Sequence, residues 1–444
     1  MSPNAPPPSS PQSSGVEGQG LWKATRWLLI WIACIWLGYQ FWRLLFQFTP
    51  PGNVALSGAV GAVDLSLRHM EVNGWFAGER IYWTQGNAVY PPASYLVLWP
   101  FVGWLNFTAS RVLFGVVTIG LVLLLVRLYV KAHEPVDRKQ RALLVLLPLA
   151  IYPVGATIGN GQLGILVLVC LTLCLPRLTG VKASWLRDLG IAALFLVALI
   201  KPTLSVPFFW IVLFARGGLR PATLIGIGYV GLTALASLAQ KNGPIQLMRA
   251  WFERGVHGAA WGARHGEGSI RAVTVASKTL PTEETTQASE PILRITSINL
   301  HSTLGYLGHA NWITPATLIA LGLVGLWVLL HRRRSIWILM AVVAIVARFY
   351  TYHGWYDDVL LLLPLIALAR IAKDPVAHSK RISSIATFLL VSMTASLLAP
   401  GGSYLLPYPW NNIYLITQSA LWLCVLMFLL IMARHPGVQP SASI

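Results

Sequence analysis

The sequence predicts an all-α polytopic membrane protein, and three observations lead to this fold class. Hydrophobic residues make up 55% of the 444-residue chain and charged residues only 11%, whereas soluble domains are nearer 25% charged. Apolar stretches of about 20 residues recur from Trp27 to Ala433, as spanning helices require. Lys and Arg are grouped in short clusters between these stretches, which is typical of cytoplasmic loops.

The apolar stretches predict about 12 transmembrane helices. We place these helices at residues 27–48, 110–130, 142–158, 163–176, 188–200, 203–215, 222–240, 313–331, 335–349, 357–372, 383–399 and 413–433.

The apolar segment 93–107 is short for a crossing, and Pro100 interrupts it. If it does not cross, the basic clusters all fall on one side, so we interpret it as a re-entrant or interfacial helix and place both termini in the cytoplasm. The clusters that this topology gathers are Lys23/Arg26, Lys131–Arg141, Arg177–Arg187, Arg216/Arg220, Arg332–Arg334, Lys373–Arg381 and Arg434.

The charge pattern also predicts the domain organisation. Residues 1–22, rich in Pro, Ser and Gly, form a disordered cytoplasmic tail, residues 23–435 form one membrane domain, and residues 436–444 form a second cytoplasmic tail. Two long loops, about 49–109 and 241–312, lie on the outer face.

The second outer loop has two parts. Ile245 to Val256 mixes apolar and charged residues and predicts an interfacial amphipathic helix. The polar run from Gly266 to Glu290 is expected to be flexible.

The net charge of +18 does not indicate nucleic-acid binding, because the basic residues lie in the loop clusters. The four cysteines lie inside apolar runs without CxxC or metal spacing, so we interpret them as small core hydrophobes. They are Cys34, Cys170, Cys174 and Cys424. Since no His cluster has metal-ligand spacing either, we expect no metal and no cofactor.

Lys201 is the most unusual charge in the sequence. It lies with Pro202 between the short apolar segments 188–200 and 203–215. Basic residues on both sides of this pair keep its ends inside, so the pair dips outward with Lys201 at its apex. A broken helix of this kind is tolerated where protein or water lines it, and a cation there usually has a partner.

On this topology the unusual polar residues share the outer side. A site built from separate segments on one face suits a membrane enzyme. The residues are Asp64, Glu71, Glu79 and Tyr90-Pro91-Pro92 in the first outer loop, Asn160-Gly161-Gln162 in a turn, Lys201, Asn299, His301 and Ser302 in the second loop, and His353, Trp355, Tyr356, Asp357 and Asp358.

Each of these features has a purely structural interpretation as well. Asp64 could be an ordinary loop carboxylate, and the prolines after Tyr90 could simply start a helix. The Asn160-Gly161-Gln162 segment could be a tight turn. His353 and Asp357, four residues apart, could form a plain helical pair.

The order of these motifs is familiar. An outer-loop carboxylate leads through Trp75-Phe76-Ala77-Gly78-Glu79-Arg80-Ile81-Tyr82 to Tyr90-Pro91-Pro92, followed by Gly161-Gln162, Lys201-Pro202, Asn299 with Ser302, and His353-Gly354-Trp355-Tyr356-Asp357. In this order the chain resembles glycosyltransferase family 87, the polyprenol-phosphate-mannose-dependent alpha-mannosyltransferases of the GT-C superfamily. The resemblance extends from about residue 30 to residue 430.

The resemblance implies a GT-C-like bundle with an inverting active site at the outer face and a polyprenyl-phosphate sugar, typically mannose, as donor. It places the catalytic base in the first outer loop, where Asp64 stands here. Two details depart from the family: Leu65-Ser66-Leu67-Arg68 follows Asp64 in place of an aromatic-rich stretch, and Asp357 is doubled by Asp358.

The chemistry assigns the remaining roles. The acceptor hydroxyl must lose a proton to a carboxylate, and the lipid phosphate that leaves needs cationic partners. We expect Lys201, Arg68 and Arg80 to bind the donor phosphate, with Arg111 as a further candidate. The expected substrate pocket contains Tyr90, Asn160, Gln162, Asn299, His353 and Asp357.

The sequence thus predicts an enzyme of the plasma (inner) membrane that passes a hexose to a glycolipid or glycan acceptor on the periplasmic or extracytoplasmic face. Membrane lipid is an expected partner and nucleic acid is not. The main alternative is a transporter or lipid flippase, which would carry ionisable residues at several midplane positions. Another outer-face membrane enzyme and a non-catalytic scaffold are further alternatives.

Overall fold

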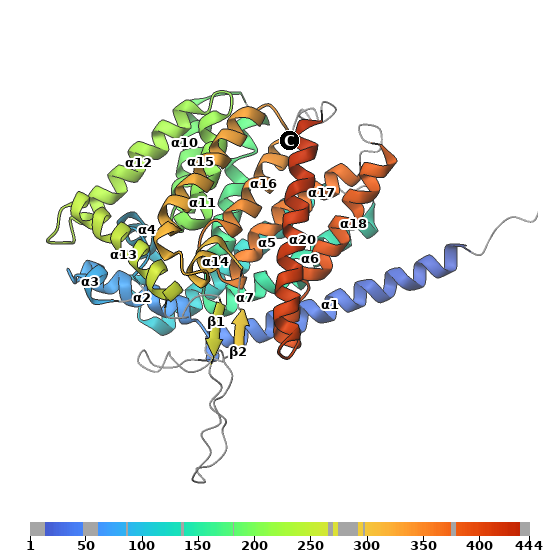
Figure 1. Ribbon diagram of the computed structural model, residues 1–444, viewed down its shortest axis with the longest axis horizontal. Coiled ribbons are helices and arrows are strands. Elements are labelled where there is room, and N and C mark those ends of the chain that lie inside the picture. The colour runs from blue at the N-terminus through green and yellow to red at the C-terminus, as the bar shows by residue number, and fades with distance from the viewer. Residues whose placement is uncertain are drawn as a thin grey trace, which may run out of the picture.

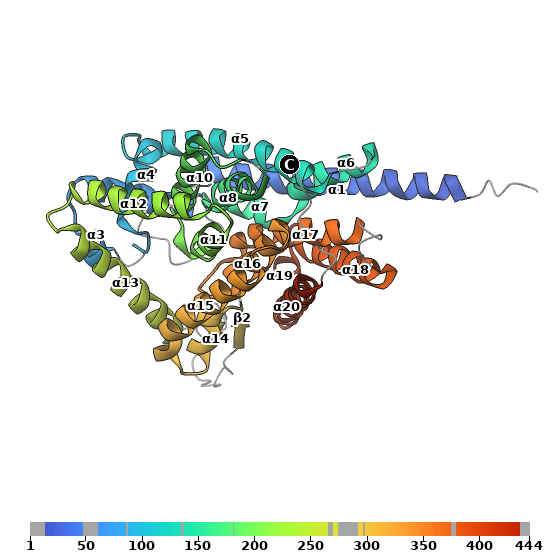
Figure 2. The same ribbon diagram turned by 90° about the horizontal axis from the view of Figure 1, so that it is seen from above.

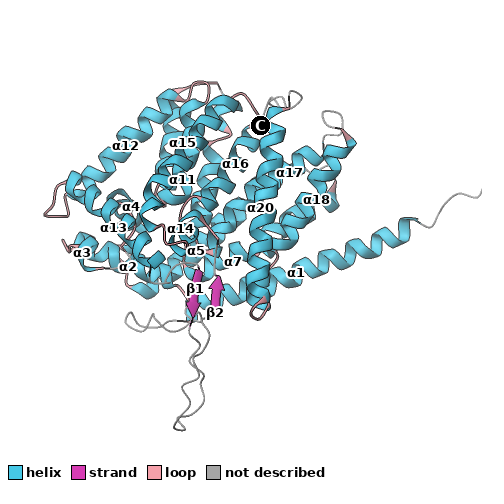
Figure 3. Cartoon of the chain, viewed as in Figure 1, coloured by secondary structure: helices cyan, strands magenta, loops and turns pink. Residues whose placement is uncertain are grey.

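The computed structural model describes residues 14–47, 61–85, 88–134, 137–180, 182–264, 270–273, 292–295, 298–373 and 379–435. Most of these residues are in helices (Figures 1 and 3). Two short strands, β1 (Ile270–Val273) and β2 (Ile292–Ile295), pair antiparallel.

Five described helices are long and apolar enough to cross a bilayer. Their side chains toward the outside are largely apolar, for example Leu123, Leu330 and Met427, which suits contact with lipid. The chain is therefore a helical, multi-pass membrane protein. The five are Trp22–Phe46 within α1 (Ser14–Phe46), α5 (Phe107–His133), α12 (Leu219–Ser237), Ala310–His331, which joins η1 (Ala310–Trp312) to α15 (Ile313–His331), and α20 (Trp410–Arg434).

Four shorter apolar segments are more deeply packed. The 14-residue α16 (Ile336–Phe349) is buried over nearly its whole length, yet at 1.5 Å per residue it reaches only about 21 Å, less than the hydrocarbon core of about 30 Å. The others are α4 (Pro92–Val102), α8 with α9 (Gly164–Cys174 and Arg177–Gly180) and α11 (Pro202–Phe214).

The break at Lys201 is confirmed. Helix α10 (Trp185–Ala198) ends three residues before Lys201, and α11 starts with Pro202 in its first turn. Lys201 itself has non-helical backbone angles, φ −124° and ψ 81°. Since the residue before a proline is disfavoured in the helical region, Pro202 accounts for this break.

Two expected continuous helices are interrupted. In place of 142–158, α6 (Arg138–Ala150) and α7 (Tyr152–Asn160) are separated by the extended residue Ile151. Pro148 and Pro153 flank this residue, and Ile151 forms a bridge with Leu398 in place of helical bonds. The backbone therefore satisfies its hydrogen bonds across to a distant segment.

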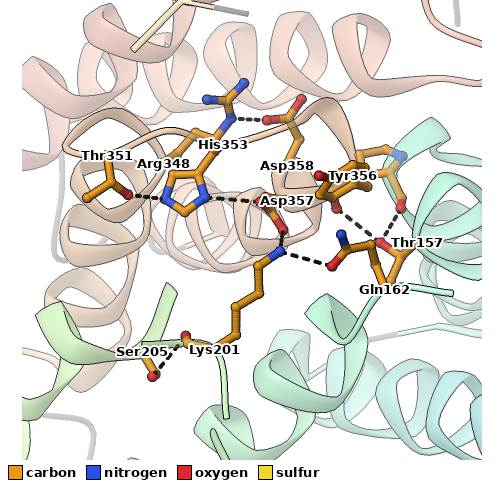
Figure 4. Close-up of polar contacts among 11 residues, drawn as sticks. Thr157, Gln162, Lys201, Ser205, Arg348, Thr351, His353, Tyr356, Asp357 and Asp358 are labelled. Atoms are coloured by element: carbon orange, nitrogen blue, oxygen red, sulfur yellow. Dashed lines mark hydrogen bonds and ion pairs between the residues drawn. The ribbon is translucent and has the colours of Figure 1, made fainter. Parts of the chain in front are cut away.

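The expected helix 357–372 likewise begins differently. Residues Trp355–Leu361 form the 3₁₀-helix η2, and the α-helix α17 (Leu362–Lys373) follows it. As consecutive residues of this helix, Asp357 and Asp358 point in different directions, toward different partners (Figure 4).

The described residues between α1 and α5 form short helices. They are α2 (Val63–Phe76), α3 (Ile81–Thr84) and α4, and Asn106 then caps α5 through a hydrogen bond from Ala109 N, 2.8 Å. The eleven-residue α4 is separate from α5, and the interpretation of 93–107 as a re-entrant or interfacial helix stays a prediction.

The segment after α12 contains the expected amphipathic helix, which is longer than predicted: α13 (Pro244–Arg264). Ile245 and Phe252 are exposed, whereas Leu247 is fully buried and the Trp251 indole donates to Val89 O, 2.8 Å. Trp251 thereby joins α13 to the residues that precede α4.

Three expected segments lie partly or wholly outside the described residues. The run Gly266 to Glu290 is expected to be flexible, yet its residues Ile270–Val273 form β1, and the rest of the run lies outside the described residues. Helix α1 starts at Ser14, inside the expected tail 1–22, whose residues 1–13 lie outside the described part. The tail 436–444 also lies outside it.

The helices form two layers, seen edge-on in Figure 2. Helices α1, α5, α6, α8, α10 and α12 lie on one side, and the other side contains α15, α16, α17, α18 (Lys380–Leu397) and α20, with α13 and α14 (Leu300–Tyr306) at one end. The one-turn helix α19 (Gly402–Leu405) precedes α20. Between the layers, η2 packs against α7 and α8, and α11 packs against α16. The polar residues of the candidate site lie at this junction.

Candidate active site

The first turn of α2 is held directly against the turn that follows α7. Ala62 N donates to Gly159 O, 2.8 Å, and Leu65 packs so closely on Gly161 that a Cβ there would lie 2.5 Å from Leu65 Cβ. Gly161 also has φ +70°, a left-handed conformation that favours glycine. The Asn160-Gly161-Gln162 turn is therefore a docking point that brings Asp64 beside Gln162.

Gly161→Ala is expected to destabilise the protein. The left-handed backbone alone costs a non-glycine residue about 1–2 kcal/mol, and the contact with Leu65 adds to that cost. The midpoint of thermal unfolding in detergent measures the effect. The control is Gly190→Ala, because Gly190 is exposed in α10 with nothing within 4 Å of an added Cβ; that change should be neutral or stabilising. Equal midpoints for the two variants would contradict this account of the turn.

Lys201 lies at the centre of the polar network (Figure 4). Its Nζ donates to Asp357 Oδ1, 2.6 Å, and to Gln162 Oε1, 3.1 Å. The ammonium is also 5.0 Å from the centre of the Tyr356 ring, within the range of a cation–π contact. The sequence assigns Lys201 to the phosphate and Asp357 to the substrate pocket, and the structure joins the two residues in an ion pair.

His353 extends this network. Its Nδ1 is 3.0 Å from Asp357 Oδ2, and its Nε2 is 2.8 Å from Thr351 Oγ1. Burial lowers the pKa of His353, although its hydrogen bond with Asp357 opposes the shift. Burial thus favours the neutral ring, which can donate from Nδ1 to the carboxylate while accepting the threonine hydroxyl at Nε2.

A second ion pair lies on the same face of α2 as Asp64. Arg68 contacts Glu71 Oε2 at 2.7 Å, and Glu71 accepts a hydrogen bond of 3.3 Å from the Tyr95 hydroxyl. The Arg68 guanidinium lies 4.2 Å from the centre of the Tyr90 ring. Burial raises the pKa of Glu71 to about 7, against the opposing effect of Arg68.

A third ion pair joins α16 to η2 next to the site. Arg348, in the last turn of α16, pairs with Asp358, and the Tyr152 hydroxyl donates to the same carboxylate. Gln418 in turn lies 3.4 Å from the Tyr152 oxygen. The two adjacent aspartates therefore have different partners. Asp357 pairs with Lys201 and His353, whereas Asp358 links η2 to Arg348 of α16 and Tyr152 of α7.

Asp64 differs from the other carboxylates of this cluster. Glu71, Asp357 and Asp358 each pair with a cation of their own, but among the described contacts Asp64 has no ion pair, only a side-chain hydrogen bond with Gln162. Burial raises the pKa of Asp64, while Gln162, Arg68 and Lys201 lower it. The residue as a whole nevertheless keeps part of its surface accessible. Among the described residues Asp64 is therefore the carboxylate of this cluster without an ion pair, although the charges of Arg68 and Lys201 act on it.

Three other residues of the expected site lie apart from this cluster in their described contacts. Arg80 is exposed, with its guanidinium 4.6 Å from the centre of the Trp83 ring. Asn160 Oδ1 accepts a hydrogen bond from Arg43, 3.2 Å. Asn299 is the N-cap of α14, where it accepts from Ser302 N, 2.9 Å. The structure thus brings Asp64, Arg68, Tyr90, Gln162, Lys201, His353 and Asp357 together.

The sequence does not single out Arg348, Tyr152 or Thr351. Arg348 carries a signal that could have identified it, because it is the one charge in the run 336–349, and an ionisable residue in an apolar helix usually has a function or a partner. Tyr152 and Thr351 carry no such signal. The partner of Tyr152, Asp358, is distant in sequence, and the contact of Thr351 with His353 depends on the local turn.

Arg111, the further candidate for the phosphate, donates from Nε to Leu44 O, 2.7 Å, at the end of α1. Within the described residues no three His, Cys, Asp or Glu side chains are grouped as a metal site. Independence of metal stays a prediction, which a transfer assay with and without a chelator would test.

Comparison with known proteins found no matching family model, no matching curated protein and no matching solved structure. The chemistry of the chain is therefore inferred from the residues that its fold gathers around Asp64 and Lys201.

Proposed function

We propose that this protein is a membrane glycosyltransferase that moves a hexose, with mannose as the first candidate, from a polyprenyl-phosphate donor to a glycolipid or glycan acceptor. Asp64 acts as the catalytic base. The observation that carries the proposal is the charge pattern of the cluster: among the described residues Glu71, Asp357 and Asp358 each form a buried ion pair, whereas Asp64 forms none and is hydrogen-bonded to Gln162.

The proposed step balances without a cofactor. The acceptor oxygen attacks the anomeric carbon, its proton passes to the Asp64 carboxylate, and the bond between that carbon and the phosphate oxygen breaks. Attack on the face opposite the leaving group inverts the anomeric centre. The negative charge of Asp64 also favours the oxocarbenium character of the transition state.

Lys201 is proposed to hold the departing phosphate. A lysine ammonium has three N–H donors, and the described acceptors, Asp357 and Gln162, use two of them. The third can donate to a phosphate oxygen while Asp357 and His353 hold the ammonium in place. The Arg68 guanidinium, fixed by Glu71, adds positive charge on the α2 side.

We further propose about 12 crossings of the plasma membrane with both termini in the cytoplasm. The five long helices would be completed by the shorter segments, including the interrupted pairs α6–α7 and η2–α17. The site then opens on the periplasmic or extracytoplasmic face, where the donor is expected to be a lipid-linked sugar.

Single cysteines test this topology. In a Cys34→Ala/Cys424→Ala background, Thr84→Cys and Ser403→Cys should react with an impermeant thiol reagent added to intact cells, since both positions lie on the proposed outer face. Lys139→Cys and Arg333→Cys should react only after the cells are opened. Labelling of Lys139→Cys in intact cells would show that the segment 93–107 crosses the membrane.

A transporter or lipid flippase is the second candidate, and one observation favours it. The ion pairs Lys201–Asp357 and Arg348–Asp358 are buried between helices, and intramembrane charges often mark transport pathways. The uncompensated carboxylate beside them favours proton transfer from a substrate and therefore the enzyme.

The two candidates separate in one experiment. Purified protein is incubated in liposomes with radiolabelled polyprenyl-phosphate sugars and a membrane lipid extract. A glycosyltransferase consumes the donor and yields a labelled lipid or glycan, and Asp64→Asn abolishes that product. Movement of intact donor between leaflets without consumption would support the flippase and overturn the enzyme proposal.

A further inference from the structure

A groove between α1 and α6 has an almost wholly apolar lining, and three exposed arginines are among its residues. It has a volume of about 380 Å³, within the range of small-molecule sites. We call it the arginine groove. It is lined by Arg26 and Ile30 of α1 and by Arg138, Arg141, Ala142, Val145 and Leu146 of α6.

Helical periodicity explains this lining. On α6, Arg138, Arg141, Ala142 and Val145 follow the spacing i, i+3, i+4, i+7 and so share one face. On α1, Arg26 and Ile30 are one turn apart. In both helices, therefore, arginine comes first along the chain and apolar side chains follow.

The three arginines are not neutralised by the protein. Within the described residues none of them forms an ion pair with an acidic side chain. The nearby carboxylates have other partners: Asp137 caps α6 by accepting from Gln140 N, 2.7 Å, and Glu134 pairs with Arg370 at 3.0 Å. The groove therefore offers positive charge to a ligand.

The position of the groove specifies the class of ligand. Trp27 and Trp31 beside it are 54% and 62% exposed, and exposed tryptophans mark the membrane–water interface. The basic clusters of Arg26 and Arg138 belong to the proposed cytoplasmic side, where the leaflet carries anionic lipids. An occupant must therefore combine an anionic head with an apolar tail that continues along Val145 and Leu146.

We infer that the arginine groove binds an anionic phospholipid of the cytoplasmic leaflet. The phosphate lies among Arg26, Arg138 and Arg141, and one acyl chain follows the apolar floor between α1 and α6. This inference depends on the topology and not on the sugar-transfer activity, so either can fail without the other.

The test uses the full-length protein in nanodiscs made of phosphatidylcholine with a small fraction of phosphatidylglycerol. Native mass spectrometry after release counts the phosphatidylglycerol that stays bound. Each arginine near a membrane surface contributes about 1 kcal/mol, or about fivefold in binding. The triple variant R26Q/R138Q/R141Q should therefore bind phosphatidylglycerol about a hundredfold more weakly. The matched control R332Q/R333Q/R381Q loses the same charge from exposed positions outside the groove, after α15 and in the first turn of α18, and should change retention by no more than a few fold.

Other outcomes would overturn the inference. Equal loss of phosphatidylglycerol in both triple variants means that overall charge, not the groove, retains the lipid. Displacement by inorganic phosphate as readily as by phosphatidylglycerol means that the site binds any anion. A dimer in lipid-free detergent that only R26Q/R138Q/R141Q dissociates means that a second copy of the chain fills the groove.

Discussion

Asp64→Asn is expected to lower the rate of sugar transfer by 10²–10⁴-fold, the usual cost of removing a general base. The amide keeps the shape of the carboxylate and its contact with Gln162 but cannot accept the acceptor's proton. Donor binding should persist because Lys201 and Arg68 are untouched. The measurement is single-turnover transfer from a radiolabelled donor at matched protein concentration.

Two carboxylates of the same outer segment serve as controls. Glu79 is exposed and forms no described ion pair, so Glu79→Gln removes the same charge and should leave the rate near that of the parent. Glu71→Gln leaves the buried Arg68 without its partner, so any loss of rate must be compared with its unfolding temperature. If Asp64→Asn transfers sugar at the parent rate, the assignment of the base is wrong.

The pH dependence gives an independent check of the same residue. Asp64 accepts a proton only when it is ionised, and burial raises its pKa above that of an ordinary carboxyl. Transfer should therefore fall as the pH drops through this raised pKa, at a higher pH than for an exposed aspartate. Glu71, whose pKa is raised to about 7, could produce a similar acid limb. The acid limb should survive Glu71→Gln and be absent from the residual rate of Asp64→Asn.

The sequence predicts the gathering of polar segments better than it predicts their pairing. Proline and charge signals are local, so the break at Lys201-Pro202 and the short helix 92–102 can be predicted from the sequence. The turn at Gly161 can also be predicted from the sequence. The need for glycine there cannot, because it comes from the close approach of Leu65 in α2, which is a tertiary contact.

The pairing of charges follows from packing across the layers. Lys201 and Asp357 are 156 residues apart, and nothing in either local sequence identifies the other as its partner. The interruption of the expected helix 142–158 has a similar origin, because Ile151 pairs with Leu398, far along the chain. Apolar length indicates a helix, but it does not reveal where the backbone takes a distant hydrogen-bond partner.

The Lys201–Asp357 ion pair should separate folding from catalysis. Removing one member of a buried pair leaves an uncompensated charge and typically costs 3–5 kcal/mol, whereas replacing both members costs much less. Lys201→Met and Asp357→Asn should each lower the midpoint of thermal unfolding in detergent, and the double variant should regain much of that loss. The full cycle is measured on protein purified identically, which isolates the coupling of the two side chains.

Transfer activity should not follow the same pattern. If Lys201 donates its third N–H to the departing phosphate, the double variant lacks that donor and stays inactive even where its stability recovers. Lys201→Arg should restore only part of the activity, because a planar guanidinium replaces a point charge. Lys241→Met, the same substitution at an exposed residue of the loop after α12, is a control for handling in detergent and should keep the parent rate. Recovery of transfer together with stability in Lys201→Met/Asp357→Asn would mean that the pair only supports the fold, and the phosphate would then have to be held by an arginine.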